Sequence, residues 1–293
     1  MVAMSRLCTV RIGSSTRAGR IDGDDIVILD AADVGDVLRA GGEVTETGEA
    51  IPRETARLAP VVTAPDKVVC VGVNYLDHIE EMGRDRPSAP TYFAKFANSL
   101  IGATDDLVLP PIDVSTHIDW EVELAIVIGS PVRHASPSQA LAAVAGYTVM
   151  NDGSVRDYQR RTTQFLAGKM FEGLSPLGPV LVGVDELGDG SGLEIRSEVD
   201  GVVKQQSSTS ELCFNVVDIV QDLSAITTLM PGDVIATGTP GGVGAARTPP
   251  EWLTDGAVLR CSIEGIGATK NRCVLPYTPG AGRRTRRVSL GCE

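Results

Sequence analysis

The chain has 293 residues, of which 43% are hydrophobic and 22% charged, a balance typical of a soluble globular protein. Its formal net charge of −12 argues against nucleic acid or an anionic membrane as the main partner. That charge does not exclude a small anionic substrate, because a bound cation can dominate the local field.

No apolar run approaches the roughly 20 residues of a membrane span, and residues 1–10 lack the apolar core of a signal peptide. The six cysteines are scattered without a Cys-x-x-Cys pair, which fits neither a zinc site nor a disulfide framework. We therefore expect free thiols and a reducing, cytoplasmic location.

Residues 1–64 predict a small N-terminal β domain. Three short alternating apolar runs are separated by turns: Leu7–Ile12, Arg17–Ile21 and Ile26–Leu29. Asp22-Gly23 between two of them is a strong hairpin signal, and Val34–Ala40 predicts a short helix. Residues 43–64 are polar and contain prolines, which is typical of a connector.

Residues 65–277 predict a larger catalytic domain with an α+β fold that is mostly β. Short β-branched runs separated by Gly/Pro turns dominate: Lys67–Val73, Glu121–Ile128, Gly146–Met150, Val180–Val184, Leu193–Val199, Asp233–Thr237 and Val258–Ile263. Helical patterns are few, at Pro137–Val144 and Phe214–Ser224. This spacing favours a sandwich or barrel-like β core over alternating βαβ units. The basic residues 278–293 predict a solvated, disordered tail.

The segment Asn74–Glu81 follows an apolar strand and carries one of only three histidines. In a helical turn, His78 and Glu81 would lie at i and i+3 on one face. A carboxylate beside an imidazole raises its basicity and orients it, which suits a general base acting on water. The alternative is a polar surface turn with an incidental His–Glu pair.

An acidic strand at residues 119–124 is the most informative stretch. Alternate side chains of a strand share a face, so Asp119, Glu121 and Glu123 would lie together at a repeat of about 7 Å. Their carboxylates repel one another unless a hard cation such as Mg²⁺ or Mn²⁺ binds between them. The alternative is a solvated acidic edge.

Asn151-Asp152 ends the next predicted strand, and Asp152 could supply a third oxygen ligand from a neighbouring strand end. Asn-Asp is equally suited to a turn or a helix cap. Arg156 and Gln159, at i and i+3, could grip a carboxylate or carbonyl.

Lys169 lies among apolar residues, where it could stabilise a developing oxyanion or could extend to the surface. The Gly-rich segment 237–244 lacks the Gly-Lys-Ser/Thr ending of a phosphate loop. We expect a tight loop that offers backbone N–H groups and the Thr239 hydroxyl to a small ligand.

Taken in order, these segments resemble the fumarylacetoacetate hydrolase family. The matching stretches are Val71–Tyr75 with His78 and Glu81, Phe93–Lys95, Glu121–Leu124, Asn151-Asp152 with Arg156 and Gln159, Gly168-Lys169, Pro231–Asp233, Thr237–Pro240 and Ile263–Gly267. One departure is Gly153, where relatives commonly have a bulkier residue. The resemblance implies a mixed β-roll core, a homodimer, and Mg²⁺ or Mn²⁺ held by Glu121, Glu123 and Asp152.

The family includes C–C hydrolases, decarboxylases, isomerases and hydratases acting on 2-oxo acids. The resemblance implies hydrolysis of an acylpyruvate-type 1,3-diketo acid, with the metal stabilising an enolate. His78 with Glu81 would activate water and Lys169 would steady the oxyanion. The residues expected to orient the substrate are Tyr75, Lys95, Arg156, Gln159 and Thr239.

Three alternatives remain open at this point. The same metal site would serve an oxaloacetate-like decarboxylase or a 2-hydroxy-diene-dioate isomerase or hydratase, and a non-catalytic ligand-binding protein could share the fold. Arg84 and Arg86, after the His–Glu segment, could meet a second carboxylate if that segment is a lid that closes over the substrate.

Overall fold

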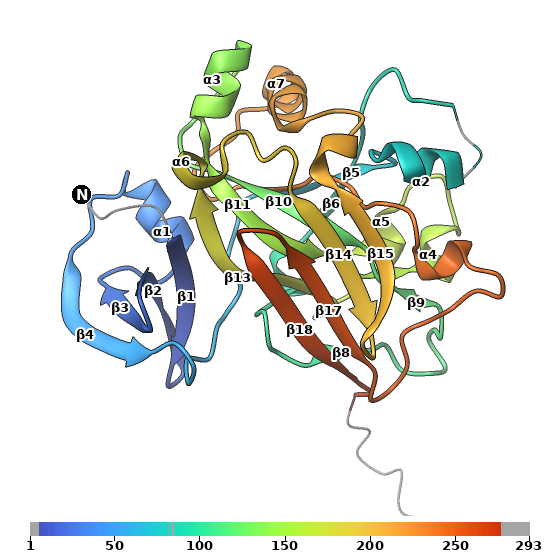
Figure 1. The fold of residues 1–293 in the computed structure, drawn as a ribbon, viewed down its shortest axis with the longest axis horizontal. Helices are drawn as coiled ribbons and strands as arrows, with labels where there is room; N and C mark the ends of the chain where they lie inside the picture. The colour runs from blue at the N-terminus through green and yellow to red at the C-terminus, as the bar shows by residue number, and fades with distance from the viewer. Residues whose placement is uncertain (1–5, 82, 84, 277–293) are drawn as a thin grey trace, which may run out of the picture.

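The computed structural model describes residues 6–81, 83 and 85–276 (Figure 1), and the predicted basic tail at 278–293 lies outside this range. Strands dominate and helices are short, so the predicted α+β, mostly β class is confirmed. Within this range no helix has the length and apolar character needed to cross a bilayer.

The N-terminal strands form an antiparallel meander. Its elements are β1 (Arg6–Ile12), β2 (Ser15–Asp22), β3 (Asp25–Leu29), α1 (Val34–Arg39) and β4 (Glu46–Pro52). The connector predicted at 43–64 is therefore wrong for β4, which pairs with β3 through Val27 and Ala50. β4 is an edge strand exposed along nearly its whole length, so it carries no alternating apolar pattern that sequence could show.

One mixed sheet runs through the molecule in the order β4-β3-β2-β1-β13-β11-β10-β16-β5-β6. Its further strands are β5 (Val68–Gly72), β6 (Thr91–Lys95), β7 (Leu100–Ile101, beside β13), β10 (Val122–Ile128), β11 (Val144–Asn151), β13 (Ser175–Gly183) and β16 (Val234–Ala236). β1 joins β13 through the Leu7–Leu181 pair, so the N-terminal meander extends the same sheet.

A second sheet packs on the first over β10, β11 and β13, and its strands β14, β15, β17 and β18 are drawn from yellow to red in Figure 1. Its order is β15 (Val202–Ser208), β14 (Glu194–Val199), β17 (Val258–Ile263), β18 (Gly267–Val274) and β8 (Leu107–Val108). Every residue of β10 is buried, as expected for a strand covered on both faces. The predicted sandwich or barrel-like β core is confirmed as two packed sheets, and the described strands do not close into a barrel.

Helices and short connecting elements flank the sheets. The helices are α2 (Leu76–Glu81), α3 (Pro137–Ala142), α4 (Arg156–Gln159), α5 (Leu166–Lys169), α6 (Val184–Leu187) and α7 (Val216–Ile226). The pair β9 (Ile118–Asp119) and β12 (Ser154–Val155) makes a small ribbon, and 3-10 turns lie at Ala97–Ser99, Thr209–Glu211 and Gly244–Ala246. The capping box of Asn215 with Asp218 explains why α7 begins where it does.

Gly153 departs from the bulkier residue expected in relatives, and the structure shows why. A Cβ at this position would lie 2.1 Å from the Leu174 carbonyl oxygen, so a side chain must displace backbone. We predict that Gly153→Ala lowers the unfolding temperature by roughly 3 °C or more, the effect of overpacking by about 1–3 kcal/mol. Gly241→Ala is the control, because its Cβ would meet nothing closer than 3.7 Å. Equal unfolding temperatures for the two variants would contradict this packing argument.

Candidate metal centre and active site

Three buried carboxylates converge where β10 and β11 meet. β10 and β11 pair antiparallel through Val122 and Asn151, and the Asp152 N–H donates to the Glu121 carbonyl at 2.8 Å. This pairing places Asp152 beside Glu121, and strand alternation places Glu123 on the same side as Glu121. One carboxylate oxygen from each of the three residues lies within 4.8 Å of the others. The set predicted from the sequence is therefore brought together.

Asp119 does not join this cluster, although it alternates with Glu121 in the sequence. The strand is interrupted at Trp120-Glu121, between β9 and β10, so the alternation does not continue through it. The Asp119 carboxylate instead accepts hydrogen bonds from the backbone of Gly244 and Ala245 at 2.7 and 2.9 Å. It also accepts one from Arg156 Nε at 2.7 Å.

Three cationic side chains surround the carboxylates. Lys169 Nζ donates to Glu121 Oε2 at 2.6 Å and to Asp152 Oδ2 at 2.7 Å. Lys95 Nζ donates to Asp152 Oδ1 at 2.7 Å, and Arg156 pairs with Glu121 Oε1 at 2.6 Å. All three are buried, so these ion pairs are shielded from solvent and hold the carboxylates in place.

The two glutamates respond differently to this environment. Burial raises the pKa of Glu121, but Lys169 and Arg156 outweigh that effect and lower it to about 2. Burial and the charges of Asp152 and Glu121 raise the pKa of Glu123 well above its usual range. Among the described residues, Glu123 has no cationic partner and accepts only the Gly238 N–H, at 2.8 Å. A carboxylate cluster left short of positive charge is the donor set that a hard divalent cation requires.

The predicted His–Glu pair forms on α2. His78 Nδ1 and Glu81 Oε2 lie 2.9 Å apart, and His78 is 8% exposed. Glu81 Oε1 also accepts the Gly242 N–H at 3.0 Å, which ties α2 to the loop after β16. Burial raises the pKa of Glu81, but the hydrogen bonds from His78 and Gly242 outweigh it and lower the pKa overall.

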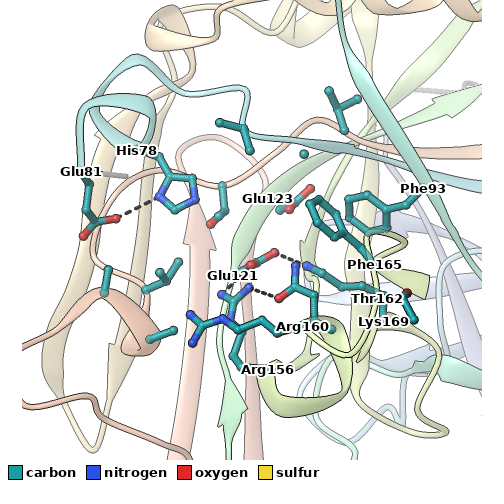
Figure 2. A pocket seen from close by; sticks show the side chains of 18 residues that line it. His78, Glu81, Phe93, Glu121, Glu123, Arg156, Arg160, Thr162, Phe165 and Lys169 are labelled. Atoms are coloured by element: carbon teal, nitrogen blue, oxygen red, sulfur yellow. Dashed lines mark hydrogen bonds and ion pairs between the residues drawn. The ribbon is translucent and has the colours of Figure 1, made fainter. Parts of the chain in front are cut away.

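One cavity of about 560 Å³ joins these two groups (Figure 2). It is lined by Val71, Gly72, Val73, His78, Glu81, Phe93, Glu121, Glu123, Arg156, Gln159, Arg160, Thr162, Phe165, Lys169, Thr239, Val243, Ala245 and Ala246. In Figure 2 the His78–Glu81 pair lies across the cavity from Lys169 and Phe165. An imidazole–carboxylate pair therefore faces a carboxylate cluster across a space of small-ligand size.

Of the residues predicted to orient the substrate, some line the cavity and others do not. Gln159 and Thr239 line the cavity, and Thr239 is fixed by hydrogen bonds to Val122 and Gln205. Lys95 is buried behind Asp152 and does not line the cavity, so it positions a carboxylate instead. Tyr75 is fully buried and absent from the lining.

Among the lining residues that were not predicted as site residues are Phe93, Arg160, Thr162 and Phe165. Phe93 and Phe165 form an edge-to-face pair with centroids 5.8 Å apart. No spacing rule connects them, because β6 and the segment before α5 meet only in the folded chain. Arg86, considered for a second carboxylate, donates instead to Cys213 Sγ and its carbonyl, each at 3.2 Å, and Arg84 lies outside the described residues.

Comparisons with known proteins agree with this geometry. Residues 67–274 match the family model for the fumarylacetoacetate hydrolase C-terminal domain. The chain is 45% identical to human oxaloacetate tautomerase FAHD2A over 226 residues, which cover 76% of this chain and 71% of the relative.

Two solved structures resemble it over nearly their whole length. A fumarylacetoacetate hydrolase from Exiguobacterium antarcticum has a TM-score of 0.84 and 33% identity, covering 92% of this chain and 99% of that one. A 2-hydroxyhepta-2,4-diene-1,7-dioate isomerase from Mycobacterium marinum has a TM-score of 0.79 and 32% identity, covering 94% and 100%.

The predicted cytoplasmic location is wrong by the same comparisons, because the human relative is a mitochondrial protein by name. The five described cysteines are buried and unpaired, as predicted. Free thiols indicate a reducing compartment without saying which one, and this is why cysteine usage misled the prediction.

The unpartnered Glu123 gives a test of the metal site. Because its folded pKa is raised, its contribution favours the fold at low pH and is lost as pH rises above the unfolded value. We predict that Glu123→Gln, which removes the charge and keeps an acceptor for Gly238, leaves the metal-free protein as stable or more stable at pH 7. The same variant should lose the rise in unfolding temperature that Mg²⁺ or Mn²⁺ gives the parent protein.

Differential scanning calorimetry with and without the ion measures both effects. Asp222→Asn is the control, because this carboxylate accepts from Tyr92 outside the cluster, and it should keep the metal response. An undiminished response in Glu123→Gln would show that the ion binds elsewhere.

Proposed function

Since this chain belongs to the fumarylacetoacetate hydrolase family, we propose that it is a divalent-metal-dependent enzyme that interconverts the keto and enol forms of a small 2-oxo dicarboxylic acid of the oxaloacetate type. The observation that carries the proposal is the hydrogen-bonded His78–Glu81 pair, which faces Glu121 and Glu123 across one cavity, with Asp152 buried beside these two glutamates. The name of the human relative, oxaloacetate tautomerase, supports this choice among the family's reactions.

The reaction moves one proton. A C–H bond breaks at C3, an O–H bond forms at the oxygen on C2, and the double bond shifts from C2–O to C2–C3. Mg²⁺ or Mn²⁺ held by Glu121, Glu123 and Asp152 would polarise the C2 carbonyl and lower the cost of negative charge on its oxygen.

His78 is the residue placed to carry the proton. Its imidazole lines the cavity, and the Glu81 carboxylate 2.9 Å from Nδ1 fixes the ring and stabilises its protonated form. Nε2 is then the nitrogen that takes the proton from C3 and delivers it to the oxygen on C2, with the reverse transfers in the other direction. Glu81 stays ionised at neutral pH because its pKa is lowered.

The predicted role of Lys169, to steady an oxyanion, stays a prediction, and its ion pairs give it a second role in the carboxylate cluster. Its ammonium is committed to Glu121 and Asp152, where burial lowers its pKa but the two carboxylates outweigh burial and raise it. A charged Lys169 bridges the Glu121 and Asp152 carboxylates and offsets the repulsion between them. Gln159 and Thr239 line the same space and provide polar contacts for the substrate.

C–C hydrolysis of an acylpyruvate-type acid is the second candidate, favoured by the name of the Exiguobacterium antarcticum structure. The same His78–Glu81 pair would then activate water. Decarboxylation and diene-dioate isomerisation or hydration use the same carboxylate cluster and remain alternatives. The expected homodimer also remains a prediction, which light scattering of the purified protein tests.

Product analysis separates these reactions. With Mg²⁺ present, we expect the protein to accelerate the loss of oxaloacetate enol absorbance with no matching release of CO₂. Acetylpyruvate should give no acetate above the uncatalysed rate. Formation of a second carboxylic acid at an enzymatic rate would instead establish the hydrolase.

A histidine substitution tests the proton carrier. His78→Asn should lower kcat/KM for tautomerisation by at least about 100-fold, the usual contribution of a general acid–base residue. Calorimetry should still show stabilisation by Mg²⁺, because His78 is not a ligand in the carboxylate cluster.

His134→Asn is the matched control, since His134 is outside the cavity and its backbone φ of 51° is one that asparagine adopts readily. Full activity in His78→Asn would remove this residue from the mechanism.

A further inference from the structure

The charged side chains that line the cavity are nearly all paired within the protein. Lys169 is bonded to Glu121 and Asp152, Arg156 to Asp119 and Glu121, and His78 to Glu81. In the described part of the chain, Arg160 is the lining cation that has no ion pair and no side-chain hydrogen bond.

Arg160 is placed relative to the carboxylate cluster by a single helical turn. It is the C-terminal cap of α4, and its N–H donates to the Arg156 carbonyl at 3.1 Å. Residues at i and i+4 lie on one helix face, about 6 Å apart along the axis. Arg156 contacts the metal-ligand candidate Glu121, and Arg160, one helical turn along from Arg156, lines the same cavity (Figure 2).

This offset matches the length of a short dicarboxylic acid. The terminal carbons of a four-carbon chain are about 4 Å apart, from three C–C bonds of about 1.5 Å each. A substrate with its 2-oxo acid end at the carboxylate cluster would therefore present its other end within reach of a flexible arginine side chain. A guanidinium is the side chain that binds a carboxylate through two parallel N–H bonds.

The neighbouring Arg161 does not share the position of Arg160 in the cavity lining. Arg161 stacks on the Tyr158 ring with its Cζ 3.3 Å from the centroid, and it does not line the cavity. Arg86 is occupied by Cys213. Two adjacent arginines of equal charge thus have different surroundings, and one of them faces the substrate space.

We propose that Arg160 binds the distal carboxylate of the substrate and so selects four-carbon 2-oxo dicarboxylic acids over 2-oxo monocarboxylic acids. This inference rests on the proposed function in one respect, which is that the 2-oxo acid end of the substrate binds at the carboxylate cluster. Thr162 also lines the cavity, but its hydroxyl already donates to the Gln164 carbonyl at 3.2 Å, so Arg160 is the group left to bind the carboxylate. Before the substrate binds, solvent hydrates the exposed guanidinium, which explains how an unpaired charge is tolerated there.

The test compares Arg160→Ala with Arg161→Ala on two acids of equal carbon number, with Mg²⁺ present. For oxaloacetate, followed by enol absorbance, Arg160→Ala should raise KM by about 10- to 100-fold, the effect of losing a hydrogen bond to a charged group, and change kcat less. For 2-oxobutyrate, followed by exchange of its C3 hydrogens in heavy water, both variants should match the parent within about twofold. Inhibition by oxalate, which has no distal group, should also be unchanged.

Calorimetric titration with the same two acids keeps this result separate from the proposed reaction. If the parent protein turns over neither acid, the tautomerase proposal fails, and a selective loss of oxaloacetate binding in Arg160→Ala would still support the role of Arg160. If the parent is active and Arg160→Ala shows no selective loss, or loses both acids equally, the role of Arg160 is overturned. Arg160→Lys should recover part of the selectivity, because it restores charge without the two-pronged geometry.

Discussion

The site depends on the repulsion between three carboxylates held within 4.8 Å of one another and away from water. At an effective dielectric constant near 20, two unit charges at that separation repel by about 3 kcal/mol. The chain offsets this with Lys169, Lys95 and Arg156, all buried and each bonded to Glu121 or Asp152. Glu123 is the carboxylate of the three that has no ion pair among the described residues, and its pKa is raised. A divalent cation bound between the carboxylates would supply the missing positive charge.

This balance changes what the cationic residues can do for a substrate. Lys95 and Lys169 form ion pairs with the clustered carboxylates, and Arg156 pairs with both Asp119 and Glu121. A second negative charge on the substrate therefore needs a cation outside this network. Lys169 and Arg160 both line the cavity, but Lys169 is ion-paired with Glu121 and Asp152, and this difference is why the proposal gives substrate recognition to Arg160.

The fold class and the carboxylate triad were predictable because each rests on a local pattern. Alternation along one strand relates Glu121 to Glu123, and a strand end places Asp152. The same rule failed for Asp119, because an interruption at Trp120 is set by tertiary hydrogen bonds to residues 244 and 245 rather than by local sequence. The edge strand β4 could not be predicted because neither of its faces is buried, so its sequence shows no alternation of apolar and polar residues.

Side-chain partners were harder to predict than positions. Lys95 and Tyr75 stand in segments that match the family, yet one lies behind Asp152 and the other is fully buried without reaching the cavity lining. Sequence indicates that a lysine is near the site, but only the packing of β6 against β5 decides which side of a carboxylate it approaches.

A single loop couples the two halves of the site. β5 and β16 run parallel through the Val68–Val234 pair, so α2 and residues 237–246 both emerge from the same sheet edge. Backbone N–H groups of that loop then donate to Glu123, to Glu81 and to Asp119. One backbone segment therefore contacts the His78–Glu81 pair, the carboxylate cluster and the carboxylate that holds Arg156. A change in that loop would alter the surroundings of Glu123, of the His78–Glu81 pair and of the Asp119–Arg156 ion pair together, so under the proposed function the loop would couple metal binding to proton transfer.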